Sequence, residues 1–229
     1  MNLDLRFFVV FRNFDSLLHG LLLTLQLVGL ACAFGILVGI IGAYLRNSHN
    51  TVLRIVASIY VEIFRNTPLL VQLYFVYFAL PTLYINLDPN PTALLVLTLN
   101  MGAYTTEIIR GGIESIHRSQ IEAGYSLGMR YLQVFRYVIL PPVMKTVAPS
   151  LSNQIILLTL ASCLVAQISA TDLFYEATLL DSRTFRSFEV YMVTGAMYFV
   201  LVEFLYIFFY YLNKKIFGFA PSQRLPSTL

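Results

Sequence analysis

The chain has 229 residues, of which 58% are hydrophobic and only 12% are charged, and its mean hydropathy is +0.72. A soluble domain carries about a quarter of its residues as charged ones, so this composition favours a membrane protein. The net charge of +3 is too small to indicate a nucleic-acid partner. Because a span needs about 20 apolar residues, a chain of this length has room for several.

Five long apolar segments predict an all-α integral membrane protein with about five transmembrane helices, at about residues 17–44, 55–80, 92–109, 143–168 and 190–212. The first contains Gly35-x-x-x-Gly39 and Gly42, which permit close packing against a neighbouring helix. The second contains Arg65-Asn66-Thr67-Pro68, and the part after Pro68 is too short to span alone. We therefore expect one long, kinked helix there. Since no internal repeat is evident, we expect a single domain over residues 1–229.

The basic residues of the connections predict the orientation. Cytoplasmic loops are rich in Lys and Arg, so the more basic set of connections is expected in the cytoplasm. This places the N-terminus outside and the C-terminus inside. The less basic set carries Arg6, Arg12, Arg183 and Arg186. The more basic set, with the adjacent Lys145, carries Arg46, Arg54, Arg110, Arg118, Arg130, Arg136, Lys145, Lys214, Lys215 and Arg224.

The connection of residues 111–142 is long enough to contain helices of its own. Ser119-Gln120-Ile121-Glu122 has the form of a capping box, which predicts the start of a short helix. Gly128 suits a left-handed cap that ends this helix. A second helix is expected to follow and to end at Pro141-Pro142, where the next span begins.

Short motifs in this loop and in its flanking spans stand in a specific order. The loop has Glu122-Ala123-Gly124, Gly128 and Ile139-Leu140-Pro141. The spans have Glu62-x-Phe64-Arg65-x-Thr67-Pro68, Ala103-Tyr104-x-x-Glu107-Ile108-x-Arg110, Pro149-x-Leu151-x-Asn153 and Arg183-x-x-Arg186-x-Phe188-Glu189. Over nearly the whole chain, these pieces resemble the permease subunits of polar amino acid ABC importers, the histidine/glutamine/glutamate-type family with an EAA loop. The family commonly has Ala at Gly124 and Lys-Asp-Thr-Ser where this chain has Leu160-Ala161-Ser162-Cys163.

This resemblance implies a type I ABC importer permease, whose spans form the translocation path for a polar or charged amino acid. The implied partners are a cytoplasmic ABC ATPase subunit, a second permease subunit, identical or paralogous, and a periplasmic or extracellular substrate-binding protein. The implied location is a bacterial cytoplasmic (inner) membrane. A short loop helix would couple the chain to the ATPase, with Ala123 and Gly124 small enough for close approach. The implied coupling residues are Glu122, Ala123, Gly124, Gly128 and Pro141.

Charged and polar residues inside the spans are the other candidates for function, because such residues are costly in lipid. Glu62 and Arg65 lie three residues apart, as do Glu107 and Arg110, so each pair could form an ion pair. Such a pair would either be part of a gate or have a structural role. Glu203 has no obvious partner on its own helix and either contacts another subunit or lines water. Five further residues either contact substrate along the path or hold helices together: Asn100, Tyr104, Asn153, Gln154 and Gln167.

The sequence also lacks the motifs of several enzyme classes. It has no G-x-x-x-x-G-K-[ST], so ATP and Mg²⁺ are expected on the partner subunit. It has no H-E-x-x-H, no G-x-S-x-G and no Cys/His cluster, so we expect no catalytic residue, no metal site and no cofactor on this chain. The alternative is a secondary amino acid transporter driven by an ion gradient. Such transporters often have matching inverted halves, which are not evident here.

Overall fold

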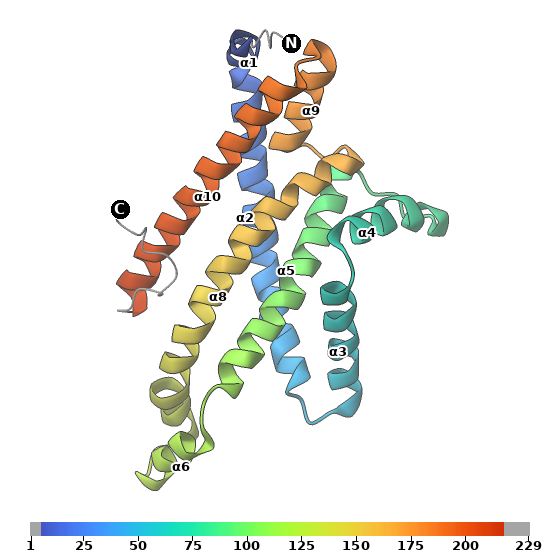
Figure 1. Cartoon of the computed structure of the whole chain (residues 1–229). Helices are drawn as coiled ribbons and strands as arrows, with labels where there is room; N and C mark the ends of the chain where they lie inside the picture. Colours follow the sequence, from blue (N-terminus) through green and yellow to red (C-terminus); the bar gives the residue numbers. More distant parts are fainter. Residues whose placement is uncertain (1–5, 218–229) are drawn as a thin grey trace.

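The computed structural model describes residues 6–217 and shows them as a bundle of helices joined by short connections (Figure 1). The first half contains α1 (Phe7–Arg12), α2 (Phe14–Arg46), α3 (Thr51–Asn66), α4 (Leu69–Tyr74), the π-helix η1 (Phe75–Ala79), the 3₁₀ helix η2 (Leu80–Leu83) and α5 (Pro89–Glu114). The second half contains α6 (Arg118–Ser126), α7 (Tyr131–Gln133), the π-helix η3 (Val134–Ile139), α8 (Leu140–Ala161), the 3₁₀ helix η4 (Ser162–Ile168), α9 (Leu173–Thr184) and α10 (Ser187–Phe217).

The expected number of apolar helices is confirmed. Four helical segments are long and apolar enough to cross a membrane, and the bent pair of Thr51–Asn66 and Leu69–Leu83 would be a fifth. The four are Phe14–Arg46, Pro89–Glu114, Tyr131–Ile168 and Ser187–Ile216. At about 1.5 Å per residue, the shortest of these still exceeds the thickness of the hydrocarbon core.

The expectation of one long, kinked helix over residues 55–80 is wrong. The chain bends by 111° between α3 and the helical segment that begins at Leu69, so α4 points away from the bundle (Figure 1). Pro68 has no N–H to donate to the carbonyl of Phe64, four residues before it. Nε2 of Gln72 donates to that carbonyl at 2.9 Å and to the carbonyl of Thr67 at 3.0 Å. The buried Gln72 side chain thus stabilises two helices at a steep angle instead of a kink.

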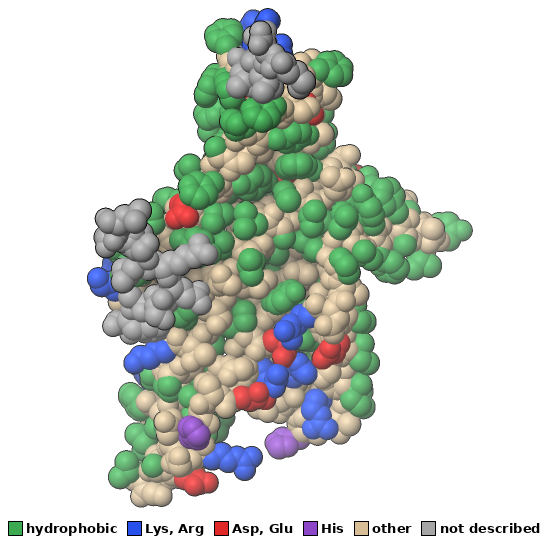
Figure 2. Space-filling view, in the orientation of Figure 1, with side chains coloured by type: hydrophobic (Ala, Val, Ile, Leu, Met, Phe, Trp, Pro, Cys, Tyr) green, Lys and Arg blue, Asp and Glu red, His purple; other side chains and the backbone are tan. Residues whose placement is uncertain are grey.

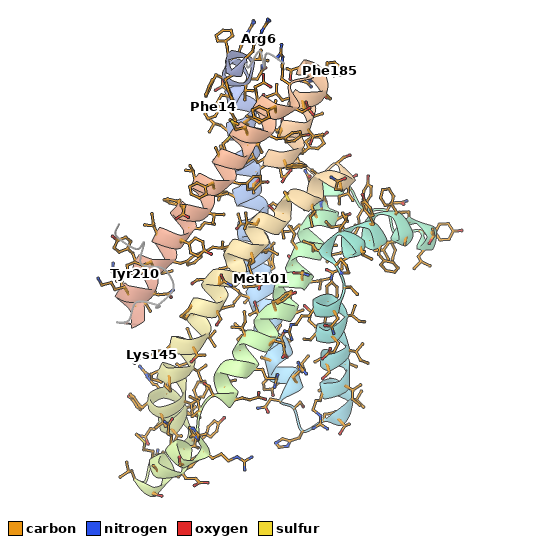
Figure 3. The ribbon with its side chains drawn as sticks, in the orientation of Figure 1. Arg6, Phe14, Met101, Lys145, Phe185 and Tyr210 are labelled. Atoms are coloured by element: carbon orange, nitrogen blue, oxygen red, sulfur yellow. The ribbon has the colours of Figure 1, made fainter. Side chains whose placement is uncertain are left out.

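The centre of the bundle is a close seam between α2 and α5. Gly35 and Gly39 of α2 face α5 as the sequence pattern predicts, and a Cβ atom added to Gly35 would lie 2.6 Å from Cβ of Met101. Oγ1 of Thr106 donates to the carbonyl of Gly39 across the seam at 3.3 Å. Met101, which is fully buried, lies at the middle of the bundle (Figure 3). Small residues therefore bring the two backbones close together.

The bundle has two distinct ends, which we call the α9 end and the α6 end (Figure 1). At the α9 end, α1, the start of α2, α9 and the start of α10 share a small apolar core that contains Val10, Leu17, Leu173 and Val190. Toward the α6 end, Lys and Arg side chains are frequent on the face in Figure 2. Arg224, used in predicting the orientation, lies outside the described residues.

Candidate functional site

A cavity of about 290 Å³ lies between the end of α3 and the facing sides of α5 and α8. Ile108, Pro149 and Ser150 form part of its wall. Pro149 interrupts the hydrogen bonds of α8 at this point, because it has no N–H. Five predicted residues from three different helices complete the lining: Arg65, Tyr104, Glu107, Asn153 and Gln154. The fold thus gathers polar residues of separate spans into one site.

Glu107 is the centre of an ion cluster that joins three helices. Its predicted pairing with Arg110 is confirmed: Nη2 of Arg110 lies 2.9 Å from Oε2, and Nε lies 3.1 Å from Oε1. Arg46, at the end of α2, donates to Oε1, and Nη1 of Arg65 lies 3.4 Å from Oε2. Arg110 also donates to Glu114 at 2.5 Å. Three guanidinium groups therefore surround one carboxylate, which has few lone pairs left for another donor.

The predicted pair of Glu62 and Arg65 is wrong. Oε2 of Glu62 instead accepts a hydrogen bond from Nδ2 of Asn66 at 2.7 Å. The guanidinium of Arg65 points toward α5, where it approaches Glu107 and lies 5.5 Å from the ring centre of Tyr104. An ion pair and a cation–π contact on the neighbouring helix outweigh a single exposed pair on the same helix.

Two of the predicted path residues lie outside this cavity. Asn100 is buried, and its Nδ2 donates to Oε1 of Gln72 at 3.2 Å, so it supports the bend after α3. These contacts match the structural alternative for Asn100. Gln167 is exposed in η4 and is not part of the cavity lining.

The short helix predicted in the long loop is present as α6, but the predicted capping box is wrong. His117 is the N-cap of α6 and makes no side-chain cap, while Ser119 already lies inside the helix. The end of the helix is as predicted, since Gly128 has φ +78° and Met129 N–H donates to the carbonyl of Gly124 at 3.2 Å. Because α6 starts before Ser119, its hydroxyl is not at the helix terminus.

Gly124, one of the predicted coupling residues, lies inside the loop and not on its exposed surface. Gly124 is buried, and a Cβ atom there would lie 3.3 Å from Cγ2 of Val134. Its small size therefore serves packing of α6 against η3. Glu122 and Ala123 are exposed, and so is Leu127, at 82%.

Pro141 and Pro142 do not end a helix. The chain remains helical from Tyr131 to Ile168. The prolines occupy the first turn of α8, directly after the π-helical turn η3. A missing N–H is tolerated there because the wider turn changes the hydrogen-bond register.

Asp172 is a residue that the sequence reasoning missed. It is fully buried at the N-cap of α9, where Oδ1 accepts from Tyr175 N–H at 2.7 Å and Oδ2 accepts from the Tyr198 hydroxyl of α10 at 3.3 Å. The next residue, Leu173, donates its N–H to Oγ1 of Thr24 in α2 at 2.9 Å. Burial raises the pKa of Asp172 to about 6. An Asp directly before an apolar helix is the signal that would have found this cap.

Glu203 lies on the exposed side of α10, with Val200 and Phe204 exposed beside it. It is not part of the cavity lining.

Comparison with known proteins places these features in one family. Residues 35–218 match the family described as the binding-protein-dependent transport system inner membrane component. The L-cystine transport system permease protein TcyB of Bacillus subtilis is 37% identical over 81% of this chain and 80% of its own length. The arginine transport system permease protein ArtQ of Bacillus subtilis is 34% identical over 88% and 92%, respectively. The glutamine transport system permease protein GlnP of Escherichia coli K12 is 32% identical over 81% and 85%.

Solved structures show the same architecture. A crystal structure of an amino acid ABC transporter with histidines contains a chain that is 34% identical, with a TM-score of 0.88 over 93% of this chain and all of that one. An inward-facing structure of the MetNI methionine ABC transporter has a TM-score of 0.71 at 19% identity and shares the fold. The fold and the relatives agree with a multi-pass, non-enzymatic permease. The chain belongs to the family of binding-protein-dependent transport system inner membrane components.

Proposed function

We propose that this chain is the membrane-spanning subunit of an ATP-driven importer for a polar or charged amino acid. The named relatives carry cystine, arginine and glutamine, which supports an amino acid as the substrate. An ABC ATPase, a second permease subunit and an external substrate-binding protein complete the proposed machine. It works in a bacterial cytoplasmic membrane, with the α6 end toward the cytoplasm.

The observation that carries the coupling proposal is the exposed surface of the loop that contains α6. Glu122 and Ala123 are exposed on this helix, and Tyr125, Leu127 and Leu132 expose 46%, 82% and 74% of their surface. Large apolar side chains next to a charged helix surface are typical of a protein interface. Gly124 and the left-handed cap at Gly128 fix α6 to the rest of the loop. A motion of an attached ATPase would thus be transmitted into α8.

The cavity beside Glu107 is the proposed part of the translocation path. It combines charge, aromatic surface and amide groups from three helices. Charged residues in membrane proteins are generally found facing such polar cavities. Asn153 and Gln154 on α8 and Tyr104 on α5 are the proposed substrate contacts, whereas Asn100 supports the bend.

The first test is purification of the chain from its native membrane, followed by mass spectrometry of the co-purifying proteins. We expect an ABC ATPase and a second permease subunit, and the identity of that subunit distinguishes a homodimer from a heterodimer. Recovery of this chain alone, under conditions that preserve known importer complexes, would support an ion-gradient-driven transporter instead.

The second test is charge reversal in α6 by Glu122→Lys. We expect loss of ATP-dependent uptake and of ATPase co-purification, because the exposed carboxylate lies on the proposed interface. The matched control is Asp88→Lys, which reverses an exposed carboxylate at the N-cap of α5 that makes no cap hydrogen bond. Normal levels of both variants in the membrane show that folding is intact. Unchanged uptake by Glu122→Lys would contradict the coupling role of α6.

A further inference from the structure

Arg65 differs from the other arginines of the Glu107 cluster in having unused hydrogen-bonding capacity. Arg46 exposes 18% of its side chain and donates directly to Glu107. Arg110 is held by two carboxylates, those of Glu107 and Glu114. Arg65 exposes 40%, and its single ion-pair contact within the described residues is the 3.4 Å approach to Glu107. Most of its five N–H donors are therefore free to bind a ligand.

The Arg65 side chain lines the cavity, and two contacts with α5 orient its guanidinium. The guanidinium is attracted to Glu107 from one side and lies over the ring of Tyr104 at 5.5 Å. Both contacts come from α5, while Arg65 itself is next to the bend at Pro68. A planar guanidinium that is oriented in this way matches the two oxygens of a carboxylate.

The same lining lacks a free acid. Glu107 is the only carboxylate among the described residues that line the cavity, and it already faces Arg46, Arg65 and Arg110. A ligand with an additional cationic side chain would find no unpaired carboxylate and would meet an excess of positive charge. An α-ammonium group, in contrast, can donate hydrogen bonds to the amide oxygens of Asn153 and Gln154, which also line the cavity.

We propose that Arg65 binds the α-carboxylate of the transported amino acid and that Glu107 and Tyr104 position it. The cavity selects amino acids with neutral or acidic side chains over basic ones. This inference rests on the proposed importer function and specifies its substrate class.

The direct test measures ligand binding to the purified permease–ATPase complex without the binding protein. The probes are L-glutamine, its α-amide and L-lysine, in competition with radiolabelled L-glutamine. We expect the amide and lysine to bind at least about 10-fold more weakly than glutamine, the effect of losing a charge-assisted hydrogen bond or of adding an uncompensated charge. Equal affinity of glutamine and its amide, including no measurable affinity for either, would overturn the proposal.

Variants of Arg65 complete the test. Arg65→Gln is expected to lower the affinity for glutamine to that for the amide, while the affinity for the amide stays unchanged. Arg65→Lys is expected to bind glutamine with an affinity between those of the wild type and Arg65→Gln. Glu107 keeps Arg46 and Arg110 in these variants, so the cluster that joins the helices persists. Arg54→Gln, an exposed arginine on the same helix outside the cavity, is the matched control and should behave as wild type.

Uptake by the complete transporter with loaded binding protein distinguishes the two levels of the proposal. If the wild-type complex shows no ATP-dependent uptake of any amino acid, the importer function itself is refuted. If the wild type and Arg65→Gln take up glutamine equally well, the importer stands and the Arg65 site is refuted. We expect uptake by Arg65→Gln to fall at least about 10-fold, with the ATPase still co-purifying.

Discussion

The two sides of α5 differ in how they pack against the neighbouring helices. The side toward α2 is closed, because glycines of α2 let the backbones touch Met101, Thr105 and Thr106. The side toward α8 contains a polar cavity beside Tyr104 and Glu107. Residues that are neighbours in sequence thus belong to a closely packed seam on one side of α5 and to a candidate site on the other.

The helices that hold Glu107 are not the ones that complete the cavity around it. Glu107 is held to α2 by Arg46 and to α5 itself by Arg110, so its carboxylate is fixed by the rigid side of the bundle. Arg65 and α8 complete the cavity from elements that have fewer contacts with α5. The cavity therefore lies between the closely packed pair of α2 and α5 on one side and α3 and α8 on the other.

The largest expected effect comes from opening the seam with Gly39→Val. A Cβ atom at this position would clash with Cβ and Cγ2 of Thr105, and neither atom is the free end of a flexible chain. We expect a loss of about 3 kcal/mol or more in stability, measured as a large drop in the apparent melting temperature of the purified complex.

The control for the seam lies on the same helix. A Cβ atom at Gly29 would meet nothing within 4 Å, so Gly29→Val should change stability by less than about 0.5 kcal/mol. Similar destabilisation by both variants would show that valine is poorly tolerated anywhere in α2, and the distinction between a close seam and an open surface would fail.

A smaller effect is expected at the α9 end, where Asp172 is buried. Since its folded pKa of about 6 lies above the ordinary 3.8, the folded state binds the proton more tightly than the unfolded state does. The stability contributed by this group is therefore present below about pH 4 and is lost as the pH rises through 6, by about 1–3 kcal/mol in total.

Asp172→Asn tests this sign. Asparagine is an equally good N-cap, so the cap of α9 persists while the titration disappears. We expect the melting temperature of the variant, relative to wild type, to rise between pH 4 and 7. A difference that is independent of pH would contradict burial of an ionised carboxylate beside Tyr198.

The fold was largely predictable from the sequence because lipid demands long apolar helices, and five such segments are visible in the chain. The polar residues of the cavity were predictable for the same reason, since polar side chains are costly in lipid and generally face a partner or a polar cavity. Which of them meet was not predictable. The pairing of Arg65 with Glu107 instead of Glu62 depends on how α3 lies against α5, and spacing along one helix carries no information about that.

Other errors have a similar origin. Pro68 predicted an interruption, but the angle of the bend also depends on Gln72 of α4, whose side chain donates hydrogen bonds back to the carbonyls of Phe64 and Thr67 at the end of α3. The capping box at Ser119 failed because a four-residue pattern cannot say where a helix begins when no side chain caps it. A local pattern gave a correct prediction where the backbone conformation requires a particular residue, as at Gly128, whose positive φ favours glycine.

The smallest expected effect concerns the α6 end, where Gly124→Ala adds one methyl group to the loop. Its Cβ would lie 3.3 Å from Cγ2 of Val134 and 3.4 Å from Cγ2 of Val138, contacts that require shifts of a few tenths of an ångström. Replacing a helical glycine by alanine stabilises by about 0.5–1 kcal/mol, so we expect a small rise in melting temperature and unchanged uptake. Gly111→Ala in the last turn of α5, where nothing lies within 4 Å of the added Cβ, measures the helical contribution alone. If Gly124→Ala destabilises while Gly111→Ala does not, the packing of α6 on η3 is as unyielding as the α2–α5 seam, and the loop transmits force as a rigid body.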